Sequence, residues 1–158
     1  MRLIRYRSEY QEPMLELHRG AIEGFTLGMS QQQDEADLMA VEEVYLRNRG
    51  EFLLGLVDER LVAMGGFKWL SEGLAELRRM RIAPDLHGGG YGTTLLRELE
   101  RRAFRSGVRV LCLETARRRP LTLQFYRKHG YQETGRGFYG AVETVRFSKT
   151  LDKQLCPS

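Results

Sequence analysis

The sequence predicts a single α+β domain, built on a central, mostly antiparallel mixed sheet of about six or seven strands with helices on both faces. Three observations support this fold class. The chain has 158 residues, a length that fits one domain. Strand-like segments joined by very short turns fill the middle of the sequence and predict an antiparallel meander. Helical and strand-like segments then alternate, which predicts a parallel crossover.

The N-terminal part of the chain is expected to be mainly helical. Residues 3–7 fit a short first strand, and a helix is expected to begin at Ser8, with apolar residues at helical spacing up to Ile22. Residues 24–33 are polar and glycine-bounded, which is typical of a loop. A second helix is expected over residues 34–48, because its apolar residues share one helical face.

The meander and the segments after it complete the predicted sheet. Strands are expected over residues 51–57, 61–70 and 74–82, joined by tight turns. A helix over residues 90–106 ends at Gly107, which suits a helix terminus. The remaining expected segments are a mostly apolar strand over 108–113, a helix over 120–129, a strand over 131–134, a loop over 135–140 and a last strand over 143–148.

Composition limits the classes of function. The net charge of +4 is mild and fits either an anionic ligand or a solvated basic surface. We do not expect nucleic acid binding, because the charge is spread along the chain without an aromatic-basic pattern. No N-terminal apolar segment or membrane-length apolar run occurs, so neither a signal peptide nor a membrane partner is expected. Cys112 and Cys156 are weak evidence for a disulfide, and a reducing cytoplasm fits best.

A glycine-dense turn between a strand and a helix is the strongest local signal. Gly88, Gly89, Gly90 and Gly92 leave the backbone amides almost free of side chains. The following helix presents unpaired N–H groups and the positive end of its dipole at the same place. This arrangement predicts an anion site, most often for phosphate.

Two common phosphate motifs are excluded by spacing. A P-loop needs a lysine after its last glycine, and Thr93 follows Gly92 here. A dinucleotide fingerprint starting at Gly88 or Gly90 would end on Thr93 or Leu95 instead of glycine. The preceding strand also carries more charge than the first buried strand of a dinucleotide-binding fold.

Two motifs together resemble those of the GNAT superfamily of acyl-CoA-dependent N-acyltransferases. The family pattern [Q/R]-x-x-G-x-[G/A] matches at His87, Gly90 and Gly92, with His in place of Gln or Arg. The second pattern, Y-x-x-x-G-[F/Y], begins at Tyr126. The order of elements is also similar, so the resemblance spans residues 1–151 and leaves 152–158 as a tail. One departure is Arg119, where many members have Asn.

The resemblance implies the acyl-CoA N-acyltransferase fold, with acetyl-CoA or a related acyl-CoA as co-substrate. No metal is expected, because His18, His87 and His129 show no ligand spacing. The turn amides would bind pyrophosphate, the strand end would pair with the pantetheine arm, and arginines at 117–119 would reach the remaining phosphate. A solvated basic loop explains those arginines equally well. The implied cofactor-binding residues are Met80, Arg81, Ile82, His87, Gly88, Gly89, Gly90, Tyr91, Gly92, Thr93 and Arg119.

The implied reaction is attack of an amine on a thioester. A lysine-like amine with a pKa near 10.4 is neutral in only about one molecule in 2,500 at pH 7, so a base is needed. Glu76 occupies the position of the catalytic glutamate in histone-type members, although it could instead be a surface residue paired with Arg78 or Arg79. Tyr126 occupies the position that protonates the leaving thiolate, although it could also be a packed aromatic beside Phe125.

The acceptor implied by the resemblance is a primary amine of a small molecule or a protein. Its pocket would lie near residues 25–37 and 136–142. Acidic residues there could attract a cationic amine, although acids at a helix start also compensate its dipole; they are Glu23, Asp34, Glu35 and Asp37. The alternative function is a catalytically silent acyl-CoA-binding or regulatory module on the same fold. A homodimer is compatible with either function.

Overall fold

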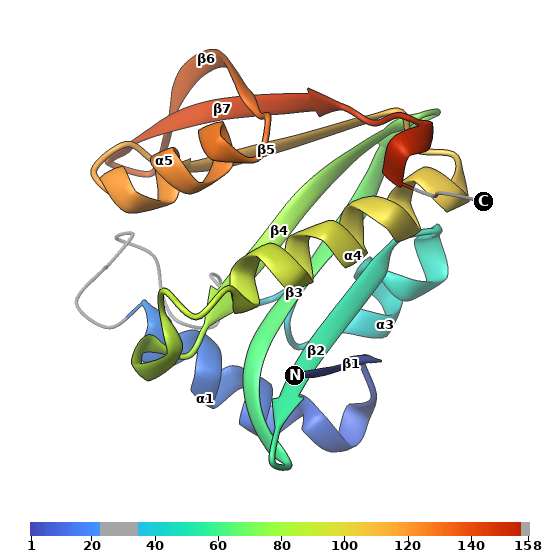
Figure 1. The fold of residues 1–158 in the computed structure, drawn as a ribbon, viewed down its shortest axis with the longest axis vertical. Helices are drawn as coiled ribbons and strands as arrows, with labels where there is room; N and C mark the ends of the chain where they lie inside the picture. Colours follow the sequence, from blue (N-terminus) through green and yellow to red (C-terminus); the bar gives the residue numbers. More distant parts are fainter. Residues whose placement is uncertain (23–34, 156–158) are drawn as a thin grey trace.

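The computed structural model describes residues 1–22 and 35–155 (Figure 1). In this part of the chain, seven strands form one mixed sheet in the order β1-β2-β3-β4-β5-β7-β6. The pair β4 and β5 is parallel, and the other neighbouring pairs are antiparallel. The strands are β1 (Arg2–Arg5), β2 (Glu51–Val57), β3 (Arg60–Ser71), β4 (Leu74–Ile82), β5 (Val110–Ala116), β6 (Gln132–Tyr139) and β7 (Val142–Thr150).

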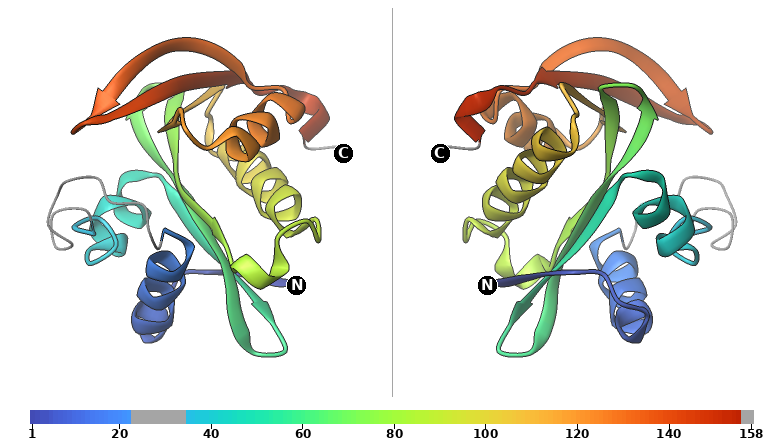
Figure 2. Two further views of the ribbon diagram at one scale, coloured as in Figure 1. Left: turned by 90° about the vertical axis from the view of Figure 1, so that its left-hand side faces the viewer. Right: turned by 90° about the vertical axis from the view of Figure 1, so that its right-hand side faces the viewer.

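The helices lie in two layers, one on each face of the sheet (Figure 2). One layer holds α1 (Gln11–Ala21) and the short α3 (Val41–Val44), and the other holds α4 (Tyr91–Ser106) and α5 (Pro120–Lys128). Short 3-10 turns occur at Ser8–Tyr10, Leu46–Asn48, Pro84–Leu86 and Lys153–Leu155. The predicted fold class is therefore confirmed.

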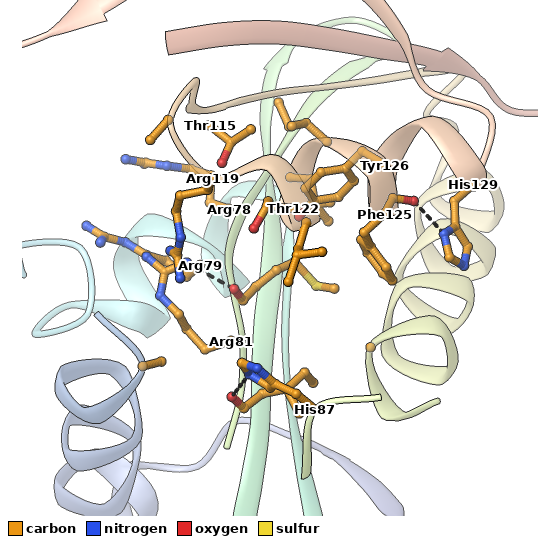
Figure 3. Close-up of a pocket in the computed structure, with 18 of the residues that line it drawn as sticks. Arg78, Arg79, Arg81, His87, Thr115, Arg119, Thr122, Phe125, Tyr126 and His129 are labelled. Carbon is orange, nitrogen blue, oxygen red and sulfur yellow. Dashed lines mark hydrogen bonds between the residues drawn. The ribbon is translucent and has the colours of Figure 1, made fainter. Parts of the chain in front are cut away.

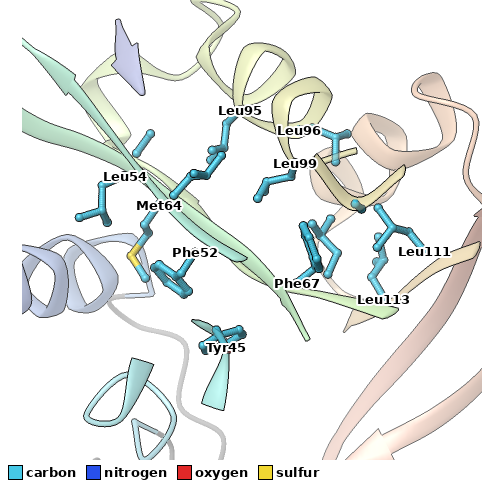
Figure 4. Packing of buried hydrophobic residues seen from close by; sticks show 14 of the residues in the cluster. Tyr45, Phe52, Leu54, Met64, Phe67, Leu95, Leu96, Leu99, Leu111 and Leu113 are labelled. Atoms are coloured by element: carbon cyan, nitrogen blue, oxygen red, sulfur yellow. The ribbon is translucent and has the colours of Figure 1, made fainter. Parts of the chain in front are cut away.

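The core has one part on each side of the sheet. Phe52 and Met64 pack toward Tyr45 on the side of α1 and α3, whereas Phe67 lies near Leu99 on the side of α4 (Figure 4). Each of these side chains is at most 1% exposed. Burying such a side chain stabilises the fold by about 1.5–3 kcal/mol, so both faces of the central meander anchor the molecule.

The sheet splits between β4 and β5. Residues 74–76 pair with residues 110–112, and the two strands then diverge (Figure 1). The second half of β4 keeps its pairing with β3 on the other side. Within the described chain, no strand fills the gap that the divergence leaves. The far half of β4 therefore presents an edge that an extended ligand can pair with.

A β-bulge in β4 changes which side chains share a face. Arg78 lies opposite Gly66 and Arg81 lies opposite Met64, so two residues of β4 oppose a single residue of β3 between these pairs. The first bulged residue, Arg79, has a φ of 61°, which non-glycine residues rarely adopt. Along a regular strand, the odd spacing would place Arg78 and Arg81 on opposite faces. The bulge places them on the same face.

The predicted helix over residues 34–48 is wrong. From residue 35 on, the chain forms turns, one α-helical turn at Val41–Val44 and a 3-10 turn at Leu46–Asn48. The carboxylate of Asp37 accepts hydrogen bonds from Arg79 on β4 and from Tyr45, and these tertiary contacts override the helical pattern.

The predicted loop over residues 135–140 is also wrong, because β6 continues to Tyr139. Pairing with β7 supplies backbone partners along this segment, with Gly137 opposite Thr144. The glycines had suggested a loop, but the ladder to β7 outweighs their weak strand preference. The predicted loop at 24–33 lies outside the described residues.

Candidate functional site

The split in the sheet leads into a pocket of about 1090 Å³ (Figure 3). Its walls come from the second half of β4, the glycine turn with the start of α4, the end of β5, and α5. The last residue of α1 also reaches it. Of the residues predicted for the site, Gly89 does not line this pocket and the others do. The structure thus gathers residues from Glu76 to Tyr126 into one place.

The glycine turn has the backbone shape that its sequence predicts. Gly88 and Gly90 have φ values of 83° and 84°, which a side chain would strain. The backbone N–H of Thr94 donates the first helical hydrogen bond, to the carbonyl oxygen of Gly90. The backbone amides just before Thr94 therefore have no acceptor within the helix. Gly92 packs against α5, and a Cβ there would lie 3.4 Å from the ring of Phe125, at ordinary contact distance. The turn can therefore bind an anion through its backbone.

His87 is bound to the end of β4. Its Nε2 lies 2.9 Å from the carbonyl oxygen of Ile82. A carbonyl can only accept, so Nε2 carries the proton and donates it. The neighbouring edge carbonyl of Met80 accepts a hydrogen bond of 2.9 Å from Arg81 Nη1. Two acceptors on the edge of β4 are thus engaged by side chains of the turn and of the strand itself.

His129 joins the start of α4 to the end of α5, a contact that the sequence analysis missed. Its Nδ1 lies 2.7 Å from the carbonyl oxygen of Phe125 and donates to it. In the neutral ring, Nε2 then accepts the hydroxyl proton of Thr93, at 3.0 Å. Thr93 and His129 are far apart in the sequence, so no local pattern signals their contact.

Tyr126 lies on α5 and lines the pocket. Its side chain is 6% exposed and packs edge-on against Phe125 and Tyr131, with ring centroids 5.2 and 5.5 Å away. Burial raises the pKa of Tyr126 to about 12, although the charges of Arg81 and Arg119 oppose the shift. The phenol is therefore protonated at neutral pH and can donate a hydrogen bond or a proton.

Glu76 lies in the same pocket, on the part of β4 that still pairs with β5. Its carboxylate forms an ion pair with Arg78, in which Nε and Oε1 are 3.2 Å apart. About a third of each side chain is exposed. Glu76 therefore lines the pocket and also forms an ion pair with Arg78, which the sequence analysis had considered as an alternative to a catalytic role.

Four arginines gather on the side of the pocket that faces α1 (Figure 3). They are Arg78, Arg79, Arg81 and Arg119. Arg117 turns away from them and pairs with Glu143 at 2.8 Å, where both side chains are more than half exposed. The run of arginines at 117–119 is therefore divided between the surface and the pocket.

Glu35 and Asp37 are bound within the protein. Glu35 is 3% exposed and pairs with Arg19 at 2.9 Å. Asp37 binds Arg79 at 2.6 Å. Burial works to raise the pKa of Asp37, but the hydrogen bonds from Arg79 and Tyr45 outweigh it and hold the pKa below its usual value. These two carboxylates stabilise the fold beside the pocket, while Glu23 and Asp34 lie outside the described residues.

Two further features bear on the class of site. Among residues 1–22 and 35–155, no group of three or more His, Cys, Asp or Glu side chains is placed to hold a metal ion. No helix in those ranges is both long enough and apolar enough to cross a membrane.

Comparison with known proteins gives matches in sequence and in fold. Residues 9–131 match the model of the acetyltransferase (GNAT) family. The chain is 36% identical over 105 residues to an IAA acetyltransferase of Azospirillum brasilense, covering 66% of this chain and 67% of the relative. An acetyltransferase of the GNAT family from Staphylococcus aureus superposes with a TM-score of 0.86 at 19% identity, covering 96% of this chain and 99% of that one. The PaiA N-acetyltransferase of Thermoplasma acidophilum, solved in complex with coenzyme A, superposes with a TM-score of 0.74 at 21% identity, covering 94% and 98% of the two chains.

Proposed function

The chain belongs to the GNAT acetyltransferase family and is an acyl-CoA-dependent acetyltransferase, and from this premise we propose that it transfers an acetyl group from acetyl-CoA to a primary amine. One observation carries the proposal. The split sheet opens a single pocket that joins an anion-binding turn, an accessible strand edge and a protonated phenol. The amine would attack the thioester directly.

The donor is bound by backbone groups in this proposal. The amides of the turn, at residues 88–93, hold the pyrophosphate at the start of α4. The edge of β4 at Met80, Arg81 and Ile82 pairs with the amide-bearing pantetheine arm as an added strand. Because Arg81 and His87 bond to edge carbonyls in the structure, the arm must share or displace these hydrogen bonds.

Tyr126 acts as the acid. The C–S bond breaks as the new C–N bond forms, and the leaving thiolate needs a proton. The phenol of Tyr126 is protonated at neutral pH and lines the pocket, so it can supply that proton or stabilise the thiolate by a hydrogen bond. Burial favours the neutral phenol over the phenolate. After Tyr126 has protonated the thiolate, its phenol forms again by taking up a proton from the attacking nitrogen.

Glu76 acts as the base, directly or through water. The amine arrives mainly as ammonium and must lose a proton before it attacks. Glu76 is the carboxylate of β4 that lines the pocket, beside Arg78, and its oxygens can accept that proton. The ammonium gives one proton to Glu76 before the attack. The nitrogen loses a second proton as the amide forms, and this proton restores the phenol of Tyr126.

A turnover assay tests the proposal. The purified protein is incubated with acetyl-CoA and a panel of primary amines, and free CoA is measured. Release that depends on an amine, with an acetylated amine found by mass spectrometry, is the expected result. Tight binding of acetyl-CoA without turnover of any amine would contradict the proposal and favour a silent acyl-CoA-binding module.

A further inference from the structure

We propose that Thr93 and His129 form a positioning pair, which holds α5 against the glycine turn so that the phenol of Tyr126 meets the donor sulfur. This role rests on the proposed function, which takes the turn as the pyrophosphate site and Tyr126 as the acid. The backbone amide of Thr93 belongs to the turn, whereas the pair uses the hydroxyl of its side chain. Neither side chain exchanges a proton with the substrates.

Two parts of the donor are bound by different helices. In the proposed complex the pyrophosphate is held at the start of α4, whereas the acid that meets the sulfur lies on α5. The donor spans both helices, so a shift of α5 relative to the turn changes the distance from the phenol to the sulfur. Proton transfer needs a heavy-atom distance of about 2.6–3.2 Å, and a misplacement of about 1 Å can lower the rate about 10²-fold. A contact that fixes α5 on the turn therefore bears directly on catalysis.

The half-buried imidazole of His129 is bound at both of its nitrogens. Nδ1 donates to the carbonyl oxygen of Phe125, 2.7 Å away (Figure 3). Nε2 accepts from the hydroxyl of Thr93 at 3.0 Å. The first bond lies at the C-terminal end of α5, and the second crosses to the first turn of α4. With both nitrogens engaged, the ring has one orientation, in which it ties the two helices together.

Aromatic packing extends this contact to the acid. The imidazole lies on the ring of Phe125 with a centroid distance of 4.4 Å, and Phe125 packs edge-on against Tyr126 at 5.2 Å. Phe125 also lies over Gly92, the residue before Thr93 in the turn. Because close-packed side chains transmit small displacements, a movement of His129 moves the phenol of Tyr126 as well.

The same hydrogen bonds argue against a direct chemical role for His129. In the neutral ring its basic nitrogen is Nε2, and this atom already accepts from Thr93. The proton on Nδ1 is donated within the protein, to Phe125. The imidazole would have to break one of these bonds before it could exchange a proton with a substrate. His129 therefore acts through the position of Tyr126.

Thr93→Val tests the pair, because valine keeps the backbone amide and the shape of the side chain but removes the hydroxyl. We expect kcat to fall about tenfold, with little change in KM for acetyl-CoA, because the turn still binds the donor. Thr93→Ser restores the hydroxyl and should recover most of kcat. Thr94→Val is the matched control, since the hydroxyl of Thr94 bonds to Gly90 within its own helix. An unchanged kcat in Thr93→Val would overturn the proposal, as would a lowered kcat that Thr93→Ser does not recover.

A second background identifies Tyr126 as the residue through which the pair acts. In a Tyr126→Phe variant, adding Thr93→Val should lower kcat by about twofold or less, because the proton donor that the pair positions is already absent. The full tenfold loss in this background would overturn the proposal and leave the proposed function intact. An unchanged kcat in Tyr126→Phe alone would reject the acid role, and the positioning role with it.

Discussion

The two halves of the pocket are built in different ways. The donor half consists of a backbone turn, a strand edge and one tyrosine, and its parts come from short segments with recognisable patterns. The acceptor half, on the side of α1, consists of charged side chains from β4 and from the loop before α5. The comparison teaches that the donor site depends on backbone conformation, whereas the acceptor site depends on a bulge and on tertiary ion pairs. Substitutions should therefore change the function of one site while leaving the other site unaffected.

Tyr126→Phe is expected to have the largest effect. Removal of the proposed acid should lower kcat by about 10²–10⁴-fold, with little change in CoA affinity, because the ring still packs against Phe125 and Tyr131. Steady-state kinetics and CoA titration measure the two quantities. Tyr131→Phe is the matched control, since the Tyr131 hydroxyl points to Glu100 and lies outside the pocket lining. An unchanged kcat in the Tyr126 variant would reject the acid role.

Glu76→Gln should lower kcat/KM by about 10²-fold at neutral pH, within the range of general base catalysis. The loss should shrink as the pH rises, because more of the amine is then neutral without help. A pH profile measures this. Glu72→Gln is the control, because Glu72 pairs with Arg49 and is largely exposed. A loss that stayed the same at all pH values would indicate that Glu76 only positions Arg78.

Asp37→Asn tests the ion pair that supports the acceptor half. It leaves Arg79, whose side chain is 11% exposed, without this charge partner and should destabilise the protein by about 3 kcal/mol. The pKa of Asp37 is lowered in the folded state, so its contribution is present above about pH 3.9 and is lost as the pH falls through the folded pKa. Denaturant unfolding measured against pH should show a shallower acid loss in the variant.

The exposed pair of Arg117 and Glu143 provides the contrast for that measurement. Glu143→Gln should change stability by about 0.5 kcal/mol or less, because solvent screens exposed ion pairs. Equal effects of the two substitutions would show that the Asp37 pair is no more important than a surface pair.

Gly90→Ala is expected to have a moderate effect on stability and a selective effect on the donor. A residue with a Cβ is strained at φ 84° by about 1–2 kcal/mol, and the shift of the turn should raise KM for acetyl-CoA about tenfold. Gly73→Ala is the matched control, because Gly73 has φ 77°, open space around it and a position in the turn between β3 and β4. It should lose similar stability without a change in KM. The same KM in both variants would argue against phosphate binding at the turn.

The sequence predicted the donor half better than the acceptor half for physical reasons. The boundaries of β4 and the start of α4 follow from local alternation, glycine and helical spacing, and the structure has them at Leu74–Ile82 and Tyr91. The contact of Thr93 with His129 and the shared face of Arg78 and Arg81 arise from packing and from the bulge, which no local pattern records.

The errors have the same origin. Asp37 is bound by Arg79 from β4, which interrupts the expected helix, and the glycines of β6 are held in a strand by β7. Long-range contacts decided both segments. The roles of Glu76 and Tyr126 in catalysis and the boundary of the domain at residue 151 remain predictions.

A structure with coenzyme A bound tests the central claim most directly. The account predicts pyrophosphate on the amides of the glycine turn and the CoA sulfur within hydrogen-bonding distance of the Tyr126 hydroxyl. A CoA sulfur outside the split between β4 and β5, away from Tyr126, would contradict it.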